Sequence, residues 1–112
     1  MTLVALVSLS VRTSALGDGT LAIHVANDTI DNLVVTLDDR NLSPHQTVLS
    51  GQMIYSNASI VASISADASG QGHACWTSMS TDREMRHCGH HGEQGINDGD
   101  TIRVYADGPC SH

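Results

Sequence analysis

The chain has 112 residues, the length of a single domain, and 40% of them are apolar, which is enough to form a hydrophobic core. Twelve acidic residues against five basic ones, with Lys absent, give a net charge of −7. This charge argues against nucleic acid and anionic membranes as partners, because both are bound through positive charge, and no apolar run reaches the ~18 residues needed to cross a bilayer.

The composition favours strands over helices. Phe is absent and Glu occurs only at Glu84 and Glu93, whereas Val, Ile, Leu and Ala fill most apolar positions. Branched aliphatic side chains suit a pleated, half-buried sheet, and the abundant Ser, Thr, Asp, Asn and Gly compete with helix formation. We therefore expect a single all-β domain over residues 1–112.

The N-terminal segment, residues 1–12, predicts a strand. Ala5, Val7, Leu9 and Val11 alternate with mostly polar neighbours, which is the two-residue period of a strand with one face in solvent. The alternative is the remainder of a secretory leader, but no basic residue precedes the apolar run. Residues 16–19 predict a tight hairpin after this strand.

Turn residues divide the rest of the chain into short alternating segments. The expected strands cover residues 21–26, 33–38, 46–49, 53–55, 59–66, 73–79 and 100–106. Together with the N-terminal strand they amount to about seven or eight, which predicts an antiparallel β-sandwich of the immunoglobulin-like kind, with a small barrel as the alternative. Trp76 is expected to fill the core, whereas Tyr55 and Tyr105 are expected near the surface.

Residues 80–99 show no strand period and are expected to form one long irregular loop. About twenty residues are many for a connection in a compact domain, which indicates either function or disorder. Thr81 and Glu84 have the spacing of a capping box, so a single helical turn through Arg86 is expected inside this loop.

The three cysteines, Cys75, Cys88 and Cys110, all lie in the C-terminal part of the chain. One intramolecular disulfide leaves a free thiol, and a disulfide-linked dimer is the alternative to a monomer. A disulfide between Cys75 and Cys88 would close the shortest loop, and loop entropy predicts that it stabilises the folded state by roughly 3 kcal/mol. A disulfide between Cys75 and Cys110 is the rival pairing. A disulfide would place the protein in the periplasm or outside the cell, whereas reduced thiols would indicate the cytoplasm.

Histidines gather in the same region, and they suggest a metal site. His87, His90 and His91 surround Cys88, and His73 could supply a further ligand beside Cys75. Imidazole and thiolate suit Zn, Cu or Ni, but this spacing matches no defined site. The competing interpretation, which we favour, is a polar loop that happens to be rich in histidine.

The sequence favours binding over catalysis. It contains no Gly-x-Ser-x-Gly turn, so a hydrolase is not expected. We expect a secreted or periplasmic interaction module for a protein or host surface, with its contact surface in the predicted loop at the five residues Arg83, Arg86, His87, His90 and His91. The alternatives are a transition-metal protein using those histidines and a thiol redox protein centred on Cys88, whose neighbours would lower the pKa of a free thiol.

Overall fold

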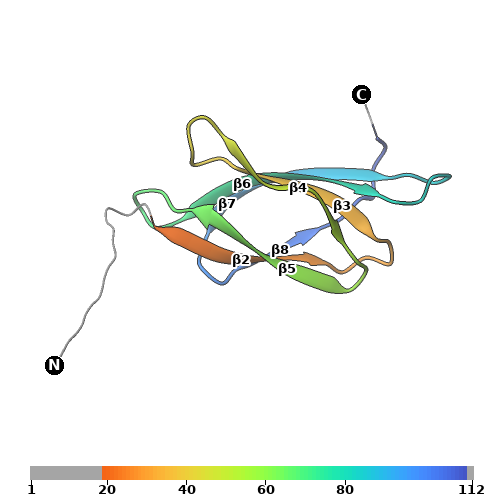
Figure 1. The fold of residues 1–112 in the computed structure, drawn as a ribbon, viewed down its shortest axis with the longest axis horizontal. Coiled ribbons are helices and arrows are strands. Elements are labelled where there is room, and N and C mark those ends of the chain that lie inside the picture. Colours follow the sequence, from red (N-terminus) through yellow and green to blue (C-terminus); the bar gives the residue numbers. More distant parts are fainter. Residues whose placement is uncertain (1–18, 111–112) are drawn as a thin grey trace.

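A computed structural model describes residues 19–110, which form seven strands and no helix (Figure 1). The strands are β2 (Thr20–Asn27), β3 (Leu33–Asp39), β4 (Gln46–Ile54), β5 (Ala58–Ser65), β6 (Gly72–Ser80), β7 (Cys88–Ile96) and β8 (Thr101–Val104). The strand predicted for residues 1–12 lies outside this range, as does most of the hairpin predicted at 16–19. Nothing in residues 19–110 is a helix that could cross a membrane.

The strands form two sheets packed face to face, which confirms the predicted all-β sandwich (Figure 1). One sheet has the order β5-β2-β8 and the other β4-β3-β6-β7. All pairings are antiparallel except β2 with β8, which run parallel. β2 therefore has a strand on both of its edges.

The core lies between the two sheets and is built from alternate residues of the central strands. Ile23 and Val25 of β2, and Val35 and Leu37 of β3, are fully buried, as the two-residue period predicts. Trp76 of β6 is 1% exposed and packs edge-on against Tyr105, with ring centroids 5.0 Å apart. The prediction that Trp76 fills the core is confirmed.

β4 is one continuous strand, whereas the sequence suggested two short ones. The expected break at residues 50–52 is an irregularity inside the strand, where Gly51 has a positive φ of 59°. The register of β4 against β3 shifts on both sides of Leu37. A β-bulge of this kind inserts residues without ending the pairing, so turn-forming residues did not mark a strand end.

The prediction of one long loop over residues 80–99 is wrong. Residues Cys88–Ile96 form β7, which pairs with β6 along its length, so that Met79 lies opposite Cys88 and Trp76 opposite His91. The connection shrinks to residues 81–87, and no helical turn forms there. The side chain of Asp82 accepts hydrogen bonds from the backbone N–H groups of Glu84 and Met85, and these local bonds shape the turn.

Candidate functional site

Three connections meet at one end of the sandwich, which we call the turn end. Residues 28–32 join β2 to β3, residues 55–57 join β4 to β5, and residues 81–87 join β6 to β7. The register fixes their proximity, since Asn27 lies opposite Ala58, and Leu33 lies opposite both Ile54 and Ser80. Segments far apart in sequence are thereby brought to one surface (Figure 1).

Hydrogen bonds tie these three connections to one another. The side-chain oxygen of Asn32 accepts from the N–H of Ser56 at 3.0 Å, and its backbone carbonyl accepts from the N–H of Thr81 at 3.2 Å. The hydroxyl of Ser56 donates to the carbonyl of Thr29 at 2.5 Å. Because each bond joins two different connections, the backbone of the turn end is preorganised.

Each of the three connections exposes one large apolar side chain. Ile30 is 92% exposed, and Tyr55 and Met85 are each 64% exposed. We call these three residues the turn triad. The three exposed apolar side chains therefore lie on connections at the same end of the sandwich.

The last described residues fold back onto β7 beside the turn end. Cys88 and Gly108 exchange backbone hydrogen bonds of 2.9 Å in both directions, and Cys88 forms a disulfide with Cys110. The carbonyl of Tyr105 passes so close to Gly89 that a Cβ on that glycine would lie 2.1 Å from it. The tail is therefore held by covalent, hydrogen-bonded and steric contacts.

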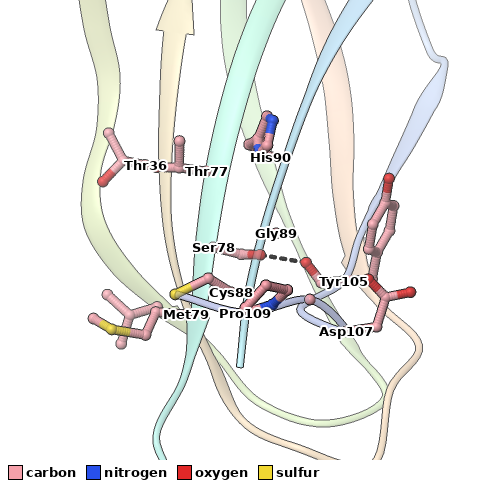
Figure 2. A pocket seen from close by; sticks show the side chains of 12 residues that line it. Thr36, Thr77, Ser78, Met79, Cys88, Gly89, His90, Tyr105, Asp107 and Pro109 are labelled. Atoms are coloured by element: carbon pink, nitrogen blue, oxygen red, sulfur yellow. Dashed lines mark hydrogen bonds between the residues drawn. The ribbon is translucent and has the colours of Figure 1, made fainter. Parts of the chain in front are cut away.

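A cavity of about 690 Å³ opens between this tail and the sheet (Figure 2). Its lining combines residues of β3, β6 and β7 with the tail: Val34, Thr36, Thr77, Ser78, Met79, Cys88, Gly89, His90, Tyr105, Asp107, Gly108 and Pro109. The hydroxyl of Ser78 donates its proton in a hydrogen bond to the backbone carbonyl of Tyr105. This serine serves to fix the tail.

The structure separates the histidines proposed as metal ligands. His90 and His91 are consecutive in β7, so their side chains point to opposite faces of the sheet. His90 lies beside Thr77 in the cavity (Figure 2). His91 instead faces Trp76, and His73 lies on β6 away from both. Within residues 19–110, no group of three or more His, Cys, Asp or Glu residues is placed to hold a metal ion.

The cysteines pair differently from both expected disulfides. Cys88 is joined to Cys110, and Cys75 is a half-buried free thiol opposite Gly92. The hairpin register explains the difference, since Cys88 faces Met79, four residues along β6 from Cys75. With Cys88 in a disulfide, the thiol redox alternative lacks its free thiol.

The predicted contact residues fall into two groups. Arg83, Arg86 and His87 lie in the connection 81–87 and thus at the turn end, whereas His90 and His91 belong to β7. Sequence reasoning missed Ile30 and Met85. An isoleucine inside the polar run of residues 27–32 was the available signal, because no strand pattern accounted for it.

The opposite end of the sandwich carries acidic turns with a structural role. The hydroxyl of Ser69, at 2.6 Å, and the backbone N–H of Gln71 stabilise the charged carboxylate of Asp67 and lower its pKa from 3.8. Asp98 accepts from the N–H of Ala22 at 2.7 Å, which caps β2 where β8 does not reach. Both carboxylates therefore accept hydrogen bonds from backbone and hydroxyl groups of their own chain.

Comparison of the chain with models of protein families, with curated proteins and with solved structures finds no match.

Proposed function

We propose that this protein is a small non-enzymatic interaction module, secreted or periplasmic, that binds a protein partner through its turn end. The turn triad carries the proposal, because three connections held by mutual hydrogen bonds each expose one large apolar side chain. A preorganised backbone loses little conformational entropy on binding, which favours affinity. The Cys88–Cys110 disulfide supports an oxidising compartment.

Charged groups flank the turn triad and complete a rim. Asp28 and Asp31 lie within two residues of Ile30, and Asp28 pairs with Arg103; Met85 lies between Glu84 and Arg86, with Arg83 two residues before it, so both signs of charge occur at the turn end. Charged residues around an apolar centre contribute mainly to orientation and association rate. The expected partner surface is apolar at its centre with polar groups around it.

The metal and thiol redox alternatives have less support than binding through the turn end. Of the histidines proposed for Zn, Cu or Ni, His73, His90 and His91 are spread over two faces of the sheet and His87 lies in the connection 81–87, and Cys88 is covalently paired. No observation on residues 19–110 favours a metal or thiol role over binding through the turn triad.

Site-specific photo-crosslinking in cells of the source organism tests the proposal. A benzophenone amino acid replaces Tyr55 in one variant and Met85 in a second, and it replaces Ser69, at the opposite end, in the control. We expect the same adduct protein from positions 55 and 85 and none from position 69. Ile30→Asp should reduce both adducts at least about tenfold, as hot-spot truncations do.

Equal adducts from position 69, or none from positions 55 and 85, would overturn the proposal. We expect every variant to fold, since all the substituted side chains are exposed. Melting curves of each variant check this.

A further inference from the structure

The four outer edges of the two sheets differ in how well they are protected against pairing with another strand. β4 and β7 form the edges of one sheet, and β5 and β8 those of the other. An exposed edge presents unpaired N–H and C=O groups, and natural proteins guard it with bulges, charges, short strands or covering segments. Three of these edges are guarded in this way.

The guarded edges each show a recognisable device. β4 carries shifts in its register against β3, and β8 is four residues long. β7 is covered at Cys88 by the tail, and its glycines Gly89, Gly92 and Gly95 weaken strand pairing. Its Glu93 also adds a charge.

β5 has none of these devices between Ala58 and Ile64. Its sequence contains no charge, no Pro and no Gly, and it pairs with β2 without any register shift. The bond from Ala66 N–H to Gly19 shows that even-numbered residues of this segment face β2. The N–H and C=O groups of Ser59, Val61 and Ser63 therefore point outward, and within residues 19–110 they have no strand partner.

Val61 lies at the middle of this edge and is 62% exposed. Its side chain is on the solvent face, whereas Ala62 and Ile64 are buried in the core. A β-branched side chain in the centre of an open, uncharged edge is well placed to pack across a strand pair.

We propose that β5 pairs antiparallel with β5 of a second copy of this chain, on a two-fold axis at Val61. In this register Val61 lies opposite its own counterpart, and Ser59 lies opposite Ser63 of the other copy. All three are outward-facing positions, so each pair can exchange both of its backbone hydrogen bonds. The two three-stranded sheets then become one six-stranded sheet.

A second copy fits this edge because the edge carries no charge and because Ser59 and Ser63 stand at equal distances on either side of Val61. Each chain has a net charge of −7, so two copies repel at most relative orientations. β5 brings no charged side chain to the contact. At Ser65 the edge is closed, because Asp39 and Asn41 bond its N–H and C=O groups, and this limits pairing to Ser59–Ser63.

Sedimentation of the intact chain over a wide concentration range tests the association. Wild type should shift from monomer to dimer as concentration rises. Val61→Lys should shift this transition at least about tenfold higher, because it sets two like charges side by side at the axis. Ala22→Lys, which adds the same charge to an exposed position of the neighbouring strand β2, should leave it unchanged.

Disulfide trapping tests the register, with Cys75→Ser as the background. Val61→Cys should form a covalent dimer on its own. Ser59→Cys and Ser63→Cys should each fail alone and crosslink when mixed, since residue 59 faces residue 63 of the other copy.

A monomeric wild type at every concentration would overturn the proposal, and so would a dimer that survives Val61→Lys or efficient crosslinking of Ser59→Cys alone. Protection of the residue 59, 61 and 63 amides from hydrogen exchange in a monomer would also overturn it, because another segment of the chain would then cover the edge. Melting curves confirm that each variant is folded.

Discussion

Two buried polar side chains hold the ends of the sandwich together. At the turn end, the Asn27 amide donates to the carbonyls of Asp31 and Ile54 and accepts from Thr29. At the other end, the carboxylate of Asp39, on β3, accepts from the N–H of Asn41 at 3.0 Å and from the N–H of Ser65 at 2.7 Å. Because Ser65 belongs to the opposite sheet, Asp39 joins the two layers directly.

Asp39→Asn should lower the free energy of unfolding by about 1–3 kcal/mol. An amide offers one acceptor oxygen where the carboxylate offers two, so one backbone N–H would lose its partner at a site that is 1% exposed. Urea denaturation measures the change. Asp38→Asn is the control: this side chain accepts from the Thr47 hydroxyl at an exposed site, and its substitution should cost less than about 0.5 kcal/mol. Equal costs would contradict this role of Asp39.

Burial of individual apolar residues could be predicted from the sequence, but these polar roles could not. Strict alternation placed Ile23, Val35 and Trp76 inside, since the side-chain period of a strand is local. Asp39 and Asn27 instead depend on partners in other strands, and sequence rules read both simply as residues that end strands.

At the scale of elements, the hairpin of β6 and β7 decides which cysteines meet. β7 was missed because it has no apolar alternation: both of its faces are largely exposed, and the positions opposite the buried Trp76 and Ala74 are the polar residues His91 and Glu93. Once it pairs with β6, Cys88 lies at the strand edge, where the returning tail brings Cys110 to it. The disulfide therefore depended on a strand that the sequence pattern did not predict.

Replacing both Cys88 and Cys110 by Ser should lower stability by about 3 kcal/mol, because their disulfide closes a loop of sequence separation 22. Cys75→Ser, in contrast, should leave the melting temperature almost unchanged, since this thiol is free. Thermal melts under oxidising conditions compare the variants. A large loss for Cys75→Ser would mean that the cysteines pair differently from this structure.

On the scale of the whole molecule, the class of the fold was predictable and the sheet order was not. Short alternating segments and the scarcity of helix formers indicated a sandwich, which the structure confirms. The parallel pairing of β8 with β2 joins the two ends of the described chain and has no local signal. The immunoglobulin-like assignment stays a prediction.

The two sheets should unfold as one cooperative unit. Trp76 is the sole tryptophan and lies in the single core between the sheets, so its fluorescence reports on both. We expect its denaturation curve to superimpose on that of the far-ultraviolet circular dichroism signal. Two separate midpoints would contradict a single domain.

The first described residue lies at the end of the sandwich opposite the turn end. Gly19, whose carbonyl accepts from the N–H of Ala66, stands at the pole opposite the turn triad. A tether attached to the exposed Ser69 side chain, in the turn between β5 and β6 at this same end, would leave Ile30, Tyr55 and Met85 facing outward. If the turn end is the binding surface proposed above, capture assays should retain partner binding when the protein is immobilised through this opposite end.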